Sequence, residues 1–228
     1  MWINDVAQAL TYFLAMLLAL TFHEAAHAFT SFVRGDNTAK VAGRMSLNPA
    51  AHADLVGTII LPLTGLLLHM PILGWAKPVP VDERNFKRPV WDSFLVGMAG
   101  PASNLVMAFM AVLVIRLYSL YGQGILPEGS FFYPAIKLLA AFAFVNAILA
   151  FFNLIPFPPL DGSAILRLIL PKPMYESFEA VAAPYGFIIL IILMMSGGLA
   201  WVGGAAQFFI RICESIVSMV LPGSHLIG

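Results

Sequence analysis

The residues best suited to chemistry are two histidines and a glutamate in the N-terminal part of the chain. They form the pattern His-Glu-x-x-His at residues 23–27. On a helix, His23 and His27 lie one turn apart on the same face, so both imidazoles can reach one zinc ion. Glu24 lies beside them, where its carboxylate can act as a general base toward a zinc-activated water. The pattern therefore predicts a metal-dependent hydrolytic centre.

A catalytic zinc ion usually has three protein ligands and one open position, so a third ligand must come from elsewhere in the chain. The candidates are His52, Asp54, His69, Asp161 and His225. Asp161 is favoured, because three prolines before it end a helix and Gly162 permits a sharp turn directly after it. We therefore predict that His23, His27 and Asp161 bind one zinc ion per chain.

Two asparagines are candidates for contacts to the reacting peptide. The oxyanion formed during peptide hydrolysis needs hydrogen-bond donors besides the metal. Asn153 and Asn104 are uncharged amides at apolar helix ends close to the proposed site. We predict that they contact the substrate or the oxyanion, the alternative being that either one caps or packs a helix.

The composition places this chemistry in a membrane. Of the 228 residues, 60% are hydrophobic and 11% are charged, whereas a soluble chain has about 25% charged residues. Twelve basic and twelve acidic residues cancel, which leaves no basic surface for nucleic acid. Cys213 is the single cysteine, so no internal disulfide forms. The chain is predicted to be an integral membrane protein with the lipid bilayer as its surroundings.

The apolar runs predict an all-α polytopic fold with about five or six transmembrane helices. The runs are Val6–Val33, Leu55–Leu73, Ser93–Leu117, Ala135–Ile155, Val181–Trp201 and Ala205–Leu221. We expect one membrane domain over residues 1–228, with a catalytic core at about 6–167 and accessory helices at about 181–221. Because the Leu55–Leu73 run contains two glycines and two prolines, we expect a re-entrant or broken segment there, the alternative being a kinked span.

The basic residues predict the orientation, because Lys and Arg collect on the cytoplasmic side. Seven of the twelve lie between the first and third runs: Arg34, Lys40, Arg44, Lys77, Arg84, Lys87 and Arg88. This places the N-terminus outside. His27 and Asp161 then both lie toward the cytoplasmic side of parallel helices, His27 at a depth of about 10 Å.

The segment at residues 77–81, Lys-Pro-Val-Pro-Val, favours an extended backbone. A helical substrate must unwind before cleavage, and an exposed strand edge can hold it by β-addition. The amides of Lys77, Val79 and Val81 would share one edge, so we predict that they bind substrate, the alternative being a plain loop. His52 and Asp54 are candidates for the mouth of the active site or for a second metal site, the alternative being an interfacial helix cap.

Together these motifs resemble the site-2 protease family of intramembrane zinc metalloproteases. The resemblance rests on the motif at 23–27, on Asn153 with Pro-Leu-Asp-Gly at 159–162, on Gly-Pro-Ala-Ser-Asn at 100–104, and on residues 74–81. It covers about residues 11–167 and is closest to the compact prokaryotic form without a PDZ or CBS domain. It implies that His23, His27 and Asp161 bind zinc and that Glu24 is the catalytic base. It also implies membrane-spanning protein substrates, regulated intramembrane proteolysis and a prokaryotic cell membrane.

One different class of function is also compatible with the pattern. A multi-span metal-ion or solute transporter could use the His/Asp cluster as a cargo site. A carrier, however, gives no reason for a glutamate between two ligands. Ionisable residues inside a bilayer cost about 2.5–3.5 kcal/mol each, so three within five positions indicate a functional site. Hydrolysis is the interpretation that uses all three.

Overall fold

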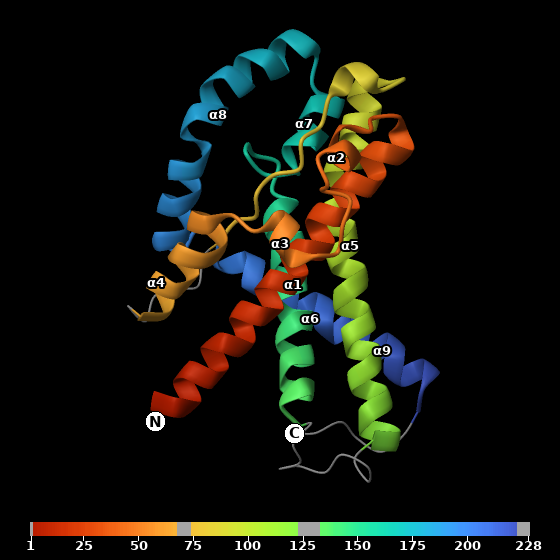
Figure 1. Cartoon of the computed structure of the whole chain (residues 1–228), viewed down its shortest axis with the longest axis vertical. Helices are drawn as coiled ribbons and strands as arrows, with labels where there is room; N and C mark the ends of the chain where they lie inside the picture. Colours follow the sequence, from red (N-terminus) through yellow and green to blue (C-terminus); the bar gives the residue numbers. More distant parts are fainter. Residues whose placement is uncertain (1, 68–73, 123–132, 223–228) are drawn as a thin grey trace.

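The structure is a computed structural model that describes residues 2–67, 74–122 and 133–222, and this part of the chain is helical without a β-strand (Figure 1). The α-helices are α1 (Trp2–Arg34), α2 (Thr38–Val41), α3 (Pro49–His52), α4 (Leu61–Leu67), α5 (Pro89–Leu117), α6 (Tyr133–Asn153), α7 (Ser163–Ile169), α8 (Lys172–Met195) and α9 (Ala200–Val220). A π-helical turn (Leu55–Ile60) precedes α4, a 3-10 turn (Glu83–Asn85) precedes α5, and a second π-helical turn (Tyr118–Gly122) follows α5.

Five helices of the described ranges are long and apolar enough to cross a membrane. They cover Val6–Arg34, Pro89–Gly122, Tyr133–Asn153, Lys172–Met195 and Ala200–Val220. The all-α polytopic fold predicted from the apolar runs is therefore confirmed, and the chain is an integral membrane protein. One predicted run was misplaced: residues 181–201 bridge the end of α8 and the start of α9. The chain turns between them at Gly197, whose φ of +77° is a conformation that glycine adopts without strain.

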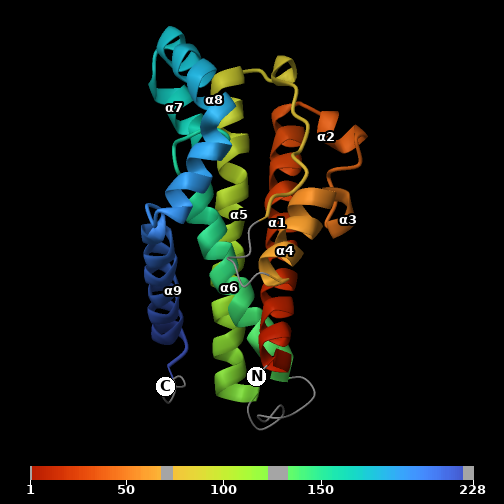
Figure 2. The same ribbon diagram turned by 90° about the vertical axis from the view of Figure 1, so that its left-hand side faces the viewer.

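The core is a bundle in which α5 and α6 lie between α1 on one side and α9 on the other (Figure 2). Small buried residues let the backbones approach closely, which is how membrane helices pack. Ala108 of α5, Ala147 of α6 and Ala206 of α9 meet in one such cluster. The close approach of α1, α5 and α6 brings residues far apart in the sequence to one level of the bundle.

The two ends of the segment between α3 and α5 lie side by side. The amide of Trp75 donates to the carbonyl oxygen of Gly57 at 3.2 Å, and the amide of Lys77 donates to that of His52 at 2.8 Å. A straight span would separate its two ends by about 30 Å. These hydrogen bonds therefore support the re-entrant segment over a kinked span, although residues 68–73 of the run lie outside the described ranges.

Asp36 connects the end of α1 to the segment that leads into α5. Its buried carboxylate accepts hydrogen bonds from the hydroxyls of Ser31 and Thr38, the side-chain amide of Asn85, and the backbone amides of Thr38 and Asp82. Burial raises the pKa of Asp36, but these hydrogen bonds outweigh it and hold the pKa well below its usual range. Because every partner is a donor, the site requires the ionised carboxylate.

The Asp36→Asn variant tests this connection. A depressed pKa in the folded state contributes stability that is present above the unfolded pKa of about 3.9 and is lost as pH falls. We expect the variant to lower the free energy of unfolding by about 2 kcal/mol at pH 7. The difference in the free energy of unfolding between the variant and the unsubstituted protein should become smaller as the pH falls below about 4. Unfolding of the detergent-solubilised protein at several pH values measures both effects.

The matched control is Glu176→Gln, which removes an exposed carboxylate that lies 3.7 Å from Lys172. It should change the stability by less than about 0.5 kcal/mol. An Asp36→Asn variant as stable as the unsubstituted protein at pH 7 would show that Asp36 does not hold the two segments together.

Candidate metal centre

Three side chains from α1 and from the segment after α6 converge on one point. The Nε2 atoms of His23 and His27 lie 3.0 Å apart. Asp161 Oδ2 lies 3.0 Å from His23 Nε2 and 3.4 Å from His27 Nε2. The two histidines are buried and Asp161 is half-buried. The structure thus brings together the three residues that were predicted as metal ligands.

Hydrogen bonds to α5 determine which ring nitrogens face the centre. His27 Nδ1 lies 2.7 Å from the carbonyl oxygen of Val96, and His23 Nδ1 lies 2.6 Å from Asn104 Oδ1. A carbonyl oxygen only accepts, so each Nδ1 carries the hydrogen. Both Nε2 atoms are then lone-pair acceptors that point at each other and at Asp161.

This donor set fits a zinc ion. Asp161 Oδ2 is buried and has no hydrogen-bond donor, so the centre holds three acceptors that a cation would satisfy together. Ligands about 2.0–2.1 Å from a tetrahedral zinc ion lie about 3.3 Å from one another, close to the separations here. Two histidines with one carboxylate also match a known type of catalytic zinc site.

At Gly100 the backbone of α5 lies directly against the two histidine rings. A Cβ atom on this residue would lie 2.4 Å from His27 Nε2 and 2.6 Å from His23 Nε2. No side chain fits in that space, because real Cβ contacts of this kind are not shorter than 3.0 Å. The backbone of α5 therefore touches the ligand atoms directly.

A folded-back loop places Asp161. The α6 helix ends at Asn153, ahead of the three prolines, and the amide of Gly162 donates to the carbonyl oxygen of Asn153 at 2.6 Å. A Cβ atom at Gly162 would lie 2.4 Å from the carbonyl oxygens of Leu154 and Ile155, so only glycine can close this turn. The turn directs the Asp161 carboxylate back toward α1.

An ion pair holds the helix that follows. Arg167 of α7 contacts Glu83 with both guanidinium nitrogens, one of them at 2.7 Å from Oε2. Glu83 also accepts a hydrogen bond from Ser93 at 2.9 Å. The Arg167 guanidinium is the main reason why the pKa of the Glu83 carboxyl is lowered. This pair ties the Asp161 side of the centre to the start of α5.

Glu24 is the unengaged carboxylate at this centre. It is half-buried on α1 next to His23, and within the described ranges it makes no hydrogen bond or ion pair. Its function as the catalytic base stays a prediction.

Asn104 has a different environment from the one expected for a substrate contact. It is fully buried. Its Nδ2 donates to the carbonyl oxygen of Ala19 at 3.2 Å and to Asn146 Oδ1 at 2.7 Å, while its Oδ1 accepts from His23. Because both amide hydrogens are engaged, Asn104 has none left for an oxyanion. Its Oδ1 faces His23 Nδ1, so these hydrogen bonds do not support the predicted contact with the oxyanion. Asn153 is half-buried and donates from Nδ2 to the Leu149 carbonyl oxygen at 3.0 Å, so its predicted contact with the substrate stays a prediction.

His52 and Asp54 build local structure beside the extended segment. His52 is buried, and its Nε2 donates to the Ser46 carbonyl oxygen at 2.7 Å. Asp54 caps the following π-helical turn through the amides of Val56 and Gly57. For Asp54 this agrees with the capping alternative, and a place for either residue at the mouth of the active site stays a prediction. The other two histidines considered as ligands, at positions 69 and 225, lie outside the described ranges.

The edge of the extended segment at Lys77 is also occupied. The Lys77 amide donates to His52, and its carbonyl oxygen lies 3.5 Å from Arg44 Nη1. The predicted free edge therefore does not include Lys77. Within the described ranges no hydrogen bond reaches the amides of Val79 or Val81, so these two stay as predicted substrate contacts.

Sequence reasoning missed the Val96 carbonyl, which accepts from His27, and Asn146, which accepts from Asn104. The Val96 carbonyl is a backbone group and leaves no trace in the sequence. Asn146 does leave a signal, since a polar residue within a long apolar run must find a partner inside the membrane.

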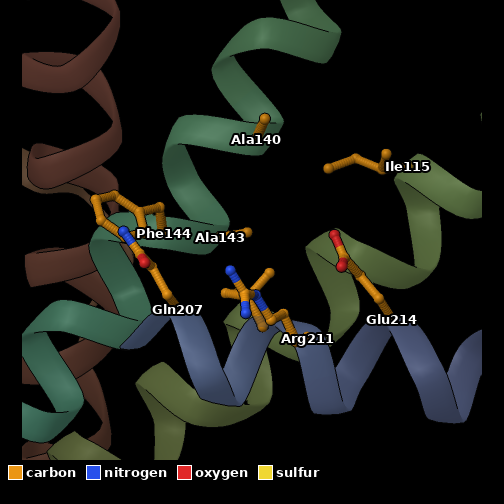
Figure 3. A pocket seen from close by; sticks show the side chains of 8 residues that line it. Ile115, Ala140, Ala143, Phe144, Gln207, Arg211 and Glu214 are labelled. Carbon is orange, nitrogen blue, oxygen red and sulfur yellow. The ribbon is translucent and has the colours of Figure 1, made fainter. Parts of the chain in front are cut away.

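A pocket of about 280 Å³ lies elsewhere in the bundle, between α5, α6 and α9 (Figure 3). Gln207, Arg211 and Glu214 of α9 line it together with apolar side chains of α5 and α6, and none of the three predicted ligands does. The metal centre is separate from this pocket.

Comparison with known proteins agrees with the geometry. Residues 125–193 match the model of peptidase family M50. "Putative zinc metalloprotease YwhC" of Bacillus subtilis is 37% identical over 80% of this chain and 79% of its own length. The chain belongs to peptidase family M50. This is the site-2 protease family that the motifs resembled, so that recognition is confirmed, and the chain is of the site-2 metalloprotease type.

Other M50 relatives are more distant. "Putative zinc metalloprotease Rip2" of Mycobacterium tuberculosis H37Rv is 28% identical over 92% of this chain and 76% of its own length. "Zinc metalloprotease MJ0392" of Methanocaldococcus jannaschii is 30% identical over 49% of this chain and 30% of its own length. No solved structure matches the chain.

The Gly100→Ala variant tests whether α5 shapes the centre. The added methyl group would push both imidazoles away from their positions, so we expect zinc affinity to fall at least about 10-fold. Competition with a chromophoric chelator on the purified protein measures the dissociation constant. Gly203→Ala is the matched control, since a Cβ atom there meets nothing within 4 Å. Unchanged zinc affinity in Gly100→Ala would show that this close approach does not form the metal site.

Proposed function

We propose that this M50 protein is an intramembrane zinc metalloprotease that hydrolyses peptide bonds in or near the transmembrane segments of other membrane proteins. One observation carries the proposal: two imidazoles of a helix long and apolar enough to cross a bilayer meet the Asp161 carboxylate, and an unengaged glutamate lies on the same helix. Such a grouping inside a span indicates function, because each ionisable residue costs free energy there.

His23, His27 and Asp161 would hold one zinc ion per chain. Zinc, when bound, supplies a Lewis acid that acidifies water and polarises the scissile carbonyl. The hydrogen bonds from both Nδ1 atoms to α5 keep the Nε2 lone pairs directed at the centre. The Asp161 side chain is 22% exposed, and the substrate would approach the centre from this side.

Glu24 would move the proton. Its carboxylate accepts a proton from the attacking water as the new carbon–oxygen bond forms. It then donates that proton to the nitrogen of the leaving amine as the carbon–nitrogen bond breaks. A carboxylate without an internal partner is suited to both steps. A carrier that only binds and releases cargo would not need such a group, so Glu24 favours hydrolysis over transport.

The substrate would be held in extended form beside residues 77–81. Lys77 is bonded to α3, which anchors this segment. In an extended backbone alternate residues face the same edge, and the amides of Val79 and Val81 are free of internal hydrogen bonds within the described ranges. These amides would pair with the unwound substrate, and Asn153 would contact the reacting peptide. Residues 6–167 would form the catalytic core, and 181–221 the accessory helices.

The protein would lie in a prokaryotic cell membrane with its N-terminus outside and its active site toward the cytoplasm. The support is the distribution of the basic residues, most of which follow the end of α1 or precede α5. In this orientation both the re-entrant segment and residues 77–81 face the cytoplasmic half.

The Glu24→Gln variant tests the proposed function. Glutamine cannot accept a proton, so we expect cleavage of membrane-helix substrates to fall by about 10²–10⁴-fold. Zinc content, measured on the same purified samples by mass spectrometry, should stay at one ion per chain. The assay incubates the reconstituted protein with a library of membrane-helix substrates and maps the cleavage sites.

Glu214→Gln is the matched control, because it removes a carboxylate of another membrane helix that lines the separate pocket. It should cleave like the unsubstituted protein. Retained cleavage in Glu24→Gln would exclude Glu24 as the base. Saturable zinc flux into liposomes without any cleavage would instead support the transporter.

Cysteine accessibility tests the orientation. In a Cys213→Ser background, a cysteine at the exposed Lys87 should react with an impermeant maleimide only after the cells are opened. A cysteine at Tyr121, which is 70% exposed at the opposite end of α5, should react in intact cells. The reverse pattern would invert the proposed topology.

A further inference from the structure

Asn146 is a buried amide in the middle of α6, between apolar neighbours. It has no exposed surface. Its Nδ2 donates to the carbonyl oxygen of Phe142 at 2.8 Å, and its Oδ1 accepts from Asn104 Nδ2 at 2.7 Å. A polar side chain at this depth is costly unless its hydrogen bonds are satisfied. All the partners of Asn146 are internal, and one of them contacts His23.

The hydrogen bonds that connect Asn146, Asn104 and His23 allow only one assignment of donors and acceptors. The Phe142 carbonyl accepts and cannot donate, so the NH₂ of Asn146 faces it and Oδ1 faces Asn104. Asn104 must then present its NH₂ to Asn146 and to the Ala19 carbonyl, which leaves Oδ1 toward His23. His23 must therefore carry its hydrogen on Nδ1.

We infer that Asn146 is a positioning residue of the metal centre: acting through Asn104, it sets the tautomer of His23. The inference rests on the proposed zinc site. With the hydrogen on Nδ1, the lone pair of His23 lies on Nε2, 3.0 Å from both His27 Nε2 and Asp161 Oδ2. With the hydrogen on Nε2, the same atom could not bind a metal ion.

Removal of the Asn146 side chain would weaken the preference of His23 for the tautomer with its hydrogen on Nδ1. The Asn104 amide would keep a single 3.2 Å hydrogen bond, to Ala19, that specifies its orientation. A half-turn of the amide would place NH₂ against His23 Nδ1 and favour the other tautomer. Part of the metal-free protein would then have the hydrogen on the wrong nitrogen, and zinc would bind more weakly.

The alternative is that Asn146 only packs α6 against α5. Three variants separate the two roles. Asn146→Leu keeps the approximate size and loses both hydrogen bonds. Asn146→Asp keeps their direction, because a buried carboxyl is protonated and can donate to Phe142 while accepting from Asn104. Val112→Ala removes a buried contact in the separate cluster of α5, α6 and α9, which makes it the control for lost packing.

The experiment measures the dissociation constant of zinc by chelator competition on the purified full-length protein. We expect about 10-fold weaker binding in Asn146→Leu, the lower end of the range for groups that orient metal ligands. Asn146→Asp should bind within about 2-fold of the unsubstituted protein, and so should Val112→Ala despite its lower thermal stability. If Asn146→Leu does not fold, Asn146→Ala carries the same expectation.

A double-mutant cycle tests whether Asn146 acts through Asn104. In an Asn104→Leu background, adding Asn146→Leu should weaken zinc binding by less than about 2-fold. An equal loss in both backgrounds, or no loss in the single variant, would overturn the inference. The ¹⁵N chemical shifts of His23 in metal-free protein give a second readout. They should show the Nδ1-protonated ring in the unsubstituted protein and a mixture of tautomers in Asn146→Leu.

The outcomes for the two proposals differ. If the unsubstituted protein binds no zinc, the proposed function fails, and the histidine shifts still decide the role of Asn146. If the unsubstituted protein and Asn146→Leu bind zinc equally and show the same tautomer, only the role of Asn146 is excluded.

Discussion

The structure depends on two hydrogen bonds from the histidines of α1 to α5. Each imidazole donates from Nδ1 to an oxygen of α5, which leaves the Nε2 lone pairs facing each other and Asp161. Lone pairs this close repel, and a cation bound between them would relieve this repulsion. Inside a bilayer no bulk water competes for the donors, so the direction of each hydrogen bond is strongly enforced. Which nitrogen of each histidine carries its hydrogen therefore depends on how α1 packs against α5 in the bundle.

The remaining framework keeps α5 in place against its neighbours. Small residues bring α1, α5 and α6 close enough for side chains of one helix to bond the backbone of another. At the end near α2, Asp36 joins α1 to the segment before α5, and Arg34 pairs with Asp92 at 2.5 Å. The Arg167–Glu83 pair connects the Asp161 side. These polar links stabilise the bundle where its helices reach the membrane surface, while the buried amides order its interior.

Hydrogen bonds also hold the segment between α3 and α5, which includes the proposed substrate-binding residues 77–81. Its two arms are hydrogen-bonded to each other through Lys77, and the Asp82 amide donates to Asp36, so residues 77–81 are held at both ends. In the proposed function, this anchoring would fix where an unwound substrate aligns relative to the metal centre. The proposed metal ligands and this edge would then act together, and the unengaged Glu24 lies on the helix that carries His23 and His27.

Local features of the sequence were enough to predict the membrane class, most of the spans and the three converging side chains. The spacing of His23 and His27 is a property of one helix, and the prolines before Asp161 act on their own backbone. The hydrogen-bond partners of Asn104, Asn146 and the Lys77 amide were decided only by tertiary structure. An amide can donate or accept, and which it does depends on a partner tens of residues away. Sequence shows that such a group needs a partner; only the packed bundle shows which partner and in which direction.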